Sequence, residues 1–353
     1  MKPERWESGS EFHWLGIPAG GSPERAAWAH GLQLSSGRDA LRLVLSIGVR
    51  ERGWRRLWVP DYYCQEVTAA LLRPGLDLVP FADDPLRPEP ELPAARHGDA
   101  VLILNYFGLR APVQVAPRDG VEVIEDHSHD PASPWAMAST ADFCVASLRK
   151  TLPLPEGGVL WSPRQHALPA EPEVTDQRRL AVASKLQAMI LKAMYLEGEP
   201  VDKSVFRMLS LKGEHELDVP SIAGMSELTR TVLSAFPSAS WRKVRAANYA
   251  VLADRLAPLG WARLLHPVTG AGVPLSAVVM MDTAQRRDAV RRRLIEDRVY
   301  PSVLWSLEDP VLPVGRRALE LSRRVLSIHC DGRYTPRDME RIAELVARAG
   351  APA

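Results

Sequence analysis

Hydrophobic residues follow two alternating patterns along this chain. Short runs that are apolar almost throughout, such as VLILNYF at 101–107 and VEVIED at 121–126, are typical of strands buried on both faces of a sheet. Between them, apolar residues recur at the three- and four-residue spacing of a helix. The first half is thus predicted to contain strands at 57–60, 76–81, 100–107, 121–125, 143–148 and 158–161, and helices at 39–50 and 66–72. This alternation predicts an α/β fold with a mostly parallel sheet covered by helices.

The second half has a different pattern. Residues 171–216 are charged and helical, and 179–196 is the clearest amphipathic helix. A helix at 238–256 then leads into strands at 277–282, 299–304 and 325–329 and helices at 284–296, 315–324 and 336–349. We therefore predict a large α/β domain over residues 1–240, with a helical or loop insertion at 170–220, and a small C-terminal α/β domain over 241–353.

Composition excludes several classes of protein. Hydrophobic residues make up 46% of the 353 residues and charged residues 25%, values typical of a globular protein. The 44 Lys and Arg residues nearly balance the 43 Asp and Glu residues, which argues against a basic nucleic-acid-binding surface. No apolar run approaches the roughly 18 residues of a membrane span, and the three cysteines are far apart, without a CxxC pair. We expect a cytoplasmic protein with neither nucleic-acid nor membrane partners.

Four polar motifs follow predicted strands or open a helix: SGRDAL at 36–41, NYFG at 105–108, EDHSHD at 125–130 and SLRK at 147–150, the last followed by EGG at 156–158. Open α/β sheets bind ligands at the carboxyl ends of their strands. The Ser36-Gly37 turn suits a phosphate at a helix N-terminus, although it also fits a simple helix cap. The two histidines, His127 and His129, lack a partner cluster, so we predict no metal site. Lys150 by itself fits a solvated side chain.

The order of these motifs, together with the VPDYY segment at 59–63, resembles the DegT/DnrJ/StrS family of pyridoxal-phosphate-dependent sugar aminotransferases of fold type I. The most specific match is Lys150 with Gly157 and Gly158 seven and eight residues later, the spacing of the family's KNLxxGEGG motif. Residues 294–305 and 326–346 are similar to the family's small domain. The resemblance implies pyridoxal 5'-phosphate as cofactor, a small-molecule substrate with an amino donor, and a homodimer.

The resemblance also implies roles for individual residues. Lys150 would bind the cofactor covalently as a Schiff base, and Asp126 would keep the cofactor's pyridine nitrogen protonated; these two are the expected catalytic residues. His129 falls where the family usually has Gln, near the phenolic oxygen of the cofactor. The remaining positions would contact the ring or the phosphate: Ser128 against the ring, and Ser36, Gly37, Arg38 and Ser147 around the phosphate.

Several positions depart from the family pattern. Arg38 replaces a threonine, and a guanidinium group can grip a phosphate with two donors. Cys64 stands where the family has the aromatic residue that stacks on the ring, so we expect that Tyr63 or Tyr62 stacks instead, or that no residue does. The family's NYRMSEL segment appears here as IAGMSEL at 222–228, without the Asn that contacts the partner subunit's phosphate. Arg38 is a candidate to replace that contact. The family's HYP motif becomes LWS at 304–306, which alters the surface that faces the substrate.

The function that this resemblance implies is transfer of an amino group to a carbonyl substrate. A keto sugar in natural-product or surface-glycan biosynthesis is one such substrate. Another reaction of the same cofactor, such as decarboxylation, elimination or carbon–carbon bond formation on a non-sugar amine or amino acid, is an alternative, because the fold and the cofactor-binding residues do not separate these outcomes. A cofactor-binding regulator without turnover is a second alternative, which the presence of Lys150 and Asp126 disfavours.

Overall fold

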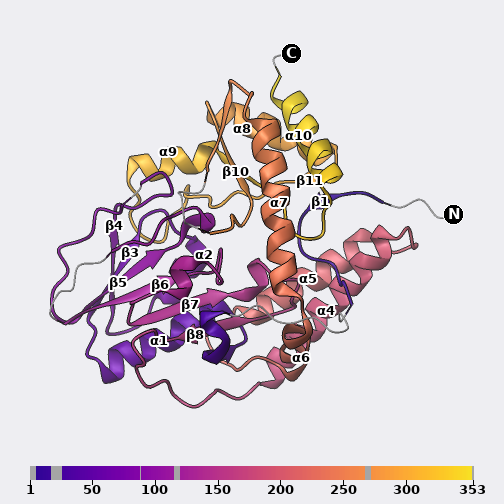
Figure 1. Ribbon diagram of the computed structural model, residues 1–353. Helices are drawn as coiled ribbons and strands as arrows, with labels where there is room; N and C mark the ends of the chain where they lie inside the picture. The colour runs from indigo at the N-terminus through magenta and orange to yellow at the C-terminus, as the bar shows by residue number, and fades with distance from the viewer. Residues whose placement is uncertain (1–4, 17–25, 88, 115–119, 267–271, 352–353) are drawn as a thin grey trace.

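The structure is a computed structural model that describes residues 5–16, 26–87, 89–114, 120–266 and 272–351. Its largest element is a seven-stranded sheet (Figure 1). The strands lie in the order β2 (Leu32–Leu34), β8 (Gly158–Trp161), β7 (Phe143–Ser147), β6 (Val121–Asp126), β5 (Asp99–Leu104), β3 (Arg56–Pro60) and β4 (Asp77–Phe81). The strands from β7 to β4 pair in parallel, and β8 is antiparallel to both its neighbours. The predicted mostly parallel sheet is therefore confirmed.

Helix α1 (Gly37–Glu51) packs against this sheet through its apolar face. Its buried side chains recur at helical spacing, and they join the largest hydrophobic cluster of the described residues. Gly48 lies directly against the ring of Trp54, where a Cβ atom would come within 1.8 Å of that ring. The short helices α2 (Gln65–Leu71) and α3 (Pro134–Met137) and the 3-10 turns η1 (Ala27–His30), η2 (Tyr106–Gly108) and η3 (Leu148–Lys150) connect the strands.

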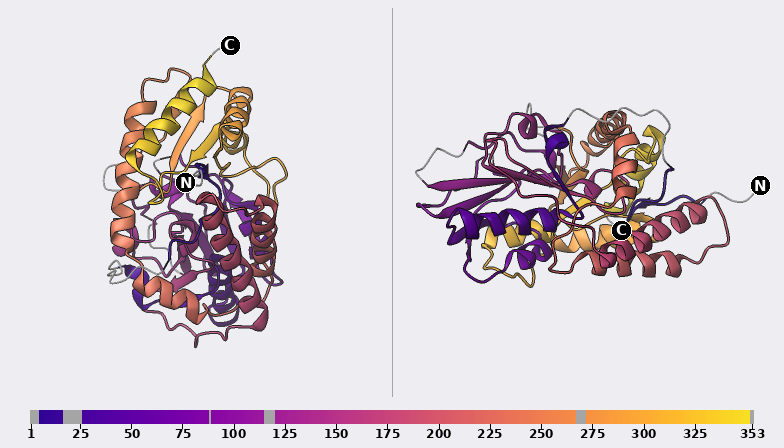
Figure 2. Two further views of the ribbon diagram at one scale, coloured as in Figure 1. Left: turned by 90° about the vertical axis from the view of Figure 1, so that its right-hand side faces the viewer. Right: turned by 90° about the horizontal axis from the view of Figure 1, so that it is seen from below.

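The charged segment after β8 forms two long helices, α4 (Asp176–Leu196) and α5 (Lys203–Leu217), followed by α6 (Glu227–Ala235). Helices α4 and α5 lie side by side as a hairpin at one end of the sheet (Figures 1 and 2). They approach closely at Gly213, where a Cβ atom would lie 2.6 Å from the Cγ atom of Lys185. The predicted helical stretch at 171–216 is thus a pair of helices, joined to α1 by the Arg38–Glu214 and Arg178–Asp39 ion pairs.

The C-terminal part has its own sheet and its own hydrophobic cluster. The antiparallel sheet has the order β12 (Val325–Ile328), β10 (Ala277–Met281) and β9 (Ala262–Leu264), and the helices are α7 (Ser238–Leu256), α8 (Ala284–Glu296), α9 (Arg316–Arg324) and α10 (Pro336–Gly350). At the start of the chain, β1 (Ser8–Gly9) pairs in parallel with β11 (Val299–Tyr300). The first described residues therefore pack on the C-terminal part, a contact that the sequence pattern did not predict. No helix of the described ranges is long and apolar enough to cross a membrane.

Candidate active site

The register of the large sheet brings the predicted motifs to one edge. Asp126 ends β6 opposite Leu104 and Val145, and Ser147 ends β7 opposite Gly158. A cavity of about 420 Å³ lies at this edge. Seven of the predicted residues line it: Ser36, Gly37, Arg38, Asp126, Ser128, Ser147 and Lys150. The motifs that lie up to 114 residues apart in the sequence therefore meet at one cavity, as the resemblance implied.

The start of α1, at Ser36, Gly37 and Arg38, lies in the wall of this cavity and is called the anion cradle below. The Ser36 hydroxyl caps the helix by accepting a hydrogen bond from the backbone N–H of Asp39 at 3.1 Å. Two glycines allow the chain segments to approach: a Cβ atom on Gly37 would lie 2.8 Å from the Cβ atom of Ser147, and one on Gly158 would lie 2.1 Å from the backbone oxygen of Ser36. The N-terminal N–H groups of a helix and its positive dipole end suit a phosphate group.

A buried carboxylate, that of Glu156 in the EGG motif, holds the turn that precedes this cradle. It accepts hydrogen bonds from the Ser35 hydroxyl at 2.5 Å and from the Ser226 backbone N–H at 2.7 Å. Glu156 therefore ties the end of β2 to the start of α6 and holds the turn before α1 in place.

Asp126 is almost fully buried at the base of the cavity. Its carboxylate accepts hydrogen bonds from the Tyr63 hydroxyl at 2.7 Å and from the Ser128 backbone N–H at 2.8 Å. Burial opposes its charge, but the Lys150 ammonium and the hydrogen bonds from Ser128 outweigh burial and lower its pKa. Asp126 is thus a fixed negative charge at neutral pH, suited to pair with a protonated ring nitrogen.

His129 is buried beside the cavity in its neutral form. Burial and the nearby Lys150 ammonium lower its pKa to about 3. Its Nδ1 atom accepts a hydrogen bond from the Phe107 backbone N–H at 3.0 Å, which assigns the ring proton to Nε2. The ring stacks on Trp305, with centroids 5.7 Å apart. His129 therefore offers a neutral N–H donor, as its predicted place near a phenolic oxygen requires.

The other histidine of the HSH sequence, His127, lies in different surroundings. Its Nε2 atom is 2.9 Å from Glu125, and its ring packs between Trp135 and Trp161. Two groups of described residues have possible ligand atoms within 4.8 Å of one another, and neither includes His129: Glu125, His127 and Cys144, and Glu122, Asp142 and His166. The two neighbouring histidines therefore do not form a common site.

Lys150 lies at the boundary of two cavities. A second cavity of about 400 Å³ lies between the large sheet and the C-terminal part, next to the first. Of the residues that the structure describes, three line both cavities: Arg149, Lys150 and Trp305. The Lys150 ammonium is 5.8 Å from the centre of the Trp305 ring. A cofactor in the first cavity and a substrate in the second would both reach Lys150.

The predicted stacking role of Tyr63 disagrees with its position. Tyr63 is fully buried, lines neither cavity and donates its hydroxyl hydrogen to Asp126. The alternative, Tyr62, is also buried and donates to the backbone oxygen of Leu304 at 2.5 Å. Among the described residues, the aromatic side chain that lines both cavities is that of Trp305, which lies in the altered segment at 304–306 and had no predicted role. Its stacking on His129 joins positions 176 residues apart, which no local pattern reveals.

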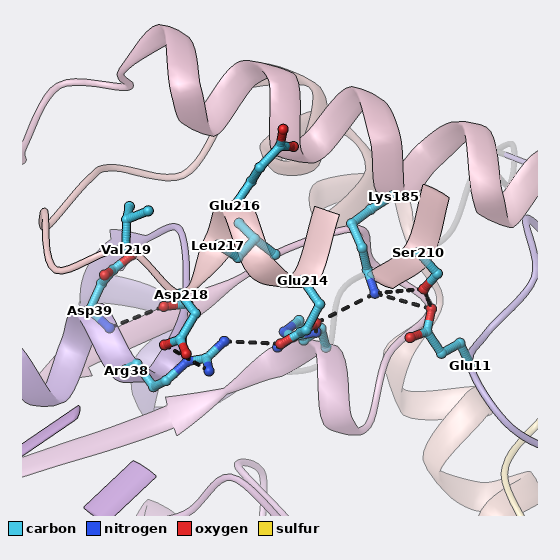
Figure 3. A network of polar contacts seen from close by, with 12 residues as sticks. Glu11, Arg38, Asp39, Lys185, Ser210, Glu214, Glu216, Leu217, Asp218 and Val219 are labelled. Carbon is cyan, nitrogen blue, oxygen red and sulfur yellow. Dashed lines mark hydrogen bonds and ion pairs between the residues drawn. The ribbon is translucent and has the colours of Figure 1, made fainter. Parts of the chain in front are cut away.

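The position of Arg38 corrects a second expectation. Arg38 lines the first cavity, but its two terminal nitrogens each lie 2.9 Å from a carboxylate, one from that of Glu214 of α5 and one from that of Asp218, the residue that follows α5 (Figure 3). The guanidinium group is thus bound to α5 in this structure, whereas we expected it to grip the phosphate. The backbone of Arg38 still forms part of the cradle at the start of α1.

These residues fit pyridoxal phosphate. The cradle accommodates a phosphate, Asp126 provides the charge for a pyridinium nitrogen, and Lys150 provides an amine between the two cavities. A buried donor also lacks a partner: among the described residues, the Nε atom of Arg149 has no hydrogen-bond acceptor. The sequence analysis missed Arg149, although its charge next to Lys150 in the SLRK motif was visible.

Comparison with known proteins gives no match by sequence, since neither a family model nor a curated protein matches this chain. Solved structures do match. S. venezuelae DesV, solved in complex with a ketimine intermediate, has a TM-score of 0.59 at 18% identity, over 92% of this chain and 85% of DesV. The aminotransferase TlmJ from Streptoalloteichus hindustanus has a TM-score of 0.61 at 17% identity, over 90% of this chain and 85% of TlmJ.

A third similar structure contains a cofactor. NtdA from Bacillus subtilis, solved with bound PMP, has a TM-score of 0.61 at 14% identity, over 90% of this chain and 73% of NtdA. At these identities the likeness concerns the fold. The predicted fold class is confirmed: the chain has the α/β fold of the pyridoxal-phosphate-dependent transferases of fold type I.

Proposed function

We propose that this protein is a pyridoxal-phosphate-dependent aminotransferase that moves an amino group from an amino donor to a small carbonyl substrate. The observation that supports this most strongly is the placement of Lys150 between the two cavities, with the charged Asp126 at the base of the first. When bound, the cofactor supplies an electron sink for the carbon that bears the amino group. The similar solved structures include aminotransferases, which agrees with this proposal.

Each residue has a defined task in this proposal. Lys150 holds the cofactor and, at its Nζ atom, removes and returns the proton of the amine-bearing carbon. Asp126 keeps the ring nitrogen protonated, and the Tyr63 hydroxyl holds the Asp126 carboxylate in place. His129 donates its Nε2–H towards the cofactor's phenolic oxygen. The phosphate group is held by Ser36, Gly37, the backbone of Arg38, and Ser147, while Ser128 lies against the ring.

A different reaction of the same cofactor is the second candidate, and one observation favours it. The segment at 222–228, which lacks the family's Asn, packs within its own chain: Gly224 forms a bridge with Leu34, and a Cβ atom there would lie 2.2 Å from the backbone oxygen of Pro172. The absence of the family's Asn from this segment, which is closely packed at Gly224, favours a different substrate or reaction. A half-reaction with a panel of amino donors, followed by cofactor absorbance, separates transamination from decarboxylation or elimination, and from a regulator that does not turn over.

The central experiment is borohydride reduction of the purified protein with its cofactor. We expect the label on the tryptic peptide that contains Lys150, because its amine is the one that lines both cavities. Lys150→Ala is expected to abolish turnover and the label while the far-ultraviolet circular dichroism stays unchanged. Lys212→Ala is the matched control, since this lysine is exposed on α5. A label on another lysine, or none, would contradict the proposed function.

The homodimer, the keto-sugar substrate and the cytoplasmic location remain predictions. Exposed apolar side chains on the α4–α5 pair are consistent with a subunit interface there: Leu180, Met194, Val205, Met208 and Leu211. Analytical ultracentrifugation of the full chain measures the oligomeric state directly.

A further inference from the structure

Arg149 occupies an unusual position next to Lys150. It lines both cavities, and both of its terminal nitrogens donate to the Glu214 carboxylate, at 2.6 and 2.5 Å. Its third nitrogen, Nε, is buried, and the Nε–H group has no acceptor within the described ranges. Several other described arginines also have an Nε atom without an acceptor, but of these only Arg149 and Arg245 line either cavity, and only Arg149 lines both. An unpaired donor in the wall of a ligand cavity therefore indicates an acceptor that a ligand provides.

Glu214 fixes the orientation of this guanidinium group. Burial opposes its charge, but the bidentate pair with Arg149 and the nearby Lys185 and Arg38 lower its pKa strongly, so it is a carboxylate throughout the ordinary pH range. A bidentate pair fixes the plane of the guanidinium group. Glu214 accepts one hydrogen bond from each terminal nitrogen, so the Nε–H group and the second N–H of each terminal nitrogen are left for a ligand.

Helix α5 is itself anchored around this contact. Lys185 of α4 lies 3.5 Å from Glu214 and 3.1 Å from Glu11, and Arg38 joins Glu214 to Asp218 (Figure 3). Glu216, two residues further along α5, points away from these contacts in the same view. Glu214 is therefore the carboxylate of α5 that pairs with both arginines of the first cavity, Arg38 and Arg149.

We propose that Arg149 is an additional oxyanion-binding residue of this site, and that Glu214 is the positioning residue that orients it. The inference rests on the proposed function, because it adds a residue to the same site. The oxyanion is either the phosphate of the cofactor in the first cavity or a carboxylate of the amino donor or substrate in the second. Both ligands present the same chemistry to an N–H donor of a guanidinium group.

The test compares three variants with the wild type: Arg149→Lys, which keeps the charge but loses the planar fork, Glu214→Gln, and the control Glu216→Gln. Calorimetry on the full chain freed of cofactor gives the affinity for inorganic phosphate, and equilibrium dialysis gives the affinity for the cofactor. Titration of the cofactor-loaded protein with glutarate, followed by absorbance, gives the affinity for a carboxylate.

We expect Arg149→Lys to weaken binding about tenfold or more in the phosphate arm or in the carboxylate arm, the factor for one hydrogen bond to a charged group. Loss in the phosphate arm assigns Arg149 to the cofactor, and loss in the carboxylate arm assigns it to the substrate. Glu214→Gln should weaken the same arm, and combining it with Arg149→Lys should add little, because Glu214 acts through Arg149. Glu216→Gln should bind like the wild type.

Unchanged affinity of a folded Arg149→Lys protein in both arms would overturn the inference. So would tighter phosphate binding by Glu214→Gln, because Glu214 would then be a competitor of the anion. These measurements do not depend on turnover. Weaker phosphate binding by Arg149→Lys together with borohydride label on a different lysine would leave the oxyanion site standing while the proposed function fails.

Discussion

Replacement of Arg178 by methionine should destabilise the protein strongly, because this arginine joins α4 to the helix that begins at the anion cradle. Its side chain is completely buried. It forms an ion pair with Asp39 of α1 at 3.0 Å and donates to the backbone oxygens of Leu217 and Ser221, the latter at 2.7 Å. Methionine keeps most of the volume and removes every one of these donors.

The size of the stability loss follows from the charge of Asp39, which stays buried in the variant. Asp39 is fully buried, and burial raises its pKa to about 6 even though Arg178 and Arg42 oppose that rise. Without Arg178, the nearest cation is Arg42, at 3.4 Å. Removing one partner of a buried ion pair costs about 3–5 kcal/mol. We expect a loss near 3 kcal/mol at pH 7, because Arg42 still compensates part of the charge of Asp39.

The sign of the pH dependence is also determined. In Arg178→Met the pKa of Asp39 rises further in the folded state, so the folded protein binds a proton more readily than the unfolded chain as pH falls from 7 to 5. Proton binding to the folded state stabilises it. The difference in unfolding free energy between variant and wild type should therefore be smaller at pH 5 than at pH 7.

Urea unfolding followed by circular dichroism at pH 7 and pH 5 measures both effects. Arg179→Met is the matched control, because Arg179 is the next residue, is largely exposed and pairs only with the exposed Asp176; such surface pairs contribute about 0–1 kcal/mol. Equal stability of the two variants at pH 7, or a loss in Arg178→Met that does not change with pH, would refute the reasoning.

Two further predictions concern the cradle and the α4 helix. Gly158→Ala should weaken the binding of inorganic phosphate in calorimetry, because its Cβ atom would lie 2.1 Å from the backbone oxygen of Ser36; Gly260→Ala, with nothing within 4 Å, should not, and equal phosphate affinity of the two variants would contradict this. Burial and the nearby Arg333 lower the pKa of Lys192 to about 7 in the folded protein, whereas its ordinary pKa is near 10.4. Between these two pH values the unfolded chain binds more protons than the folded protein, so the free energy of unfolding rises with pH. Lys192→Met should lose this rise, so the stability of the variant relative to the wild type should fall from pH 6 to pH 9 in thermal unfolding. A stability difference that stays constant over this range would show that Lys192 does not cause the pH dependence.

The local pattern of apolar and polar residues was sufficient to predict the helices and strands and to locate the site motifs along the chain. Every strand and helix that the apolar spacing predicted occurs in the structure, and β5 and β11 end earlier than expected, at Leu104 and Tyr300. The residues at strand ends were also predictable, because a parallel sheet places the carboxyl ends of its strands at one edge. Asp126, Ser147 and Lys150 meet at the cavity for this reason.

Tertiary packing decided which side chain performs each task around those residues. Tyr63 and Trp305 are both aromatic. The segment after β3 places the Tyr63 hydroxyl against Asp126, whereas the segment after β11 places Trp305 in the walls of both cavities. Likewise, the sequence shows the charge of Arg38 and of Glu214, 176 residues apart, but not that they pair. Short-range spacing predicts secondary structure because it sets which face of an element is apolar. Pairing between distant polar groups depends instead on how whole elements pack against one another, so it becomes visible only in the tertiary structure.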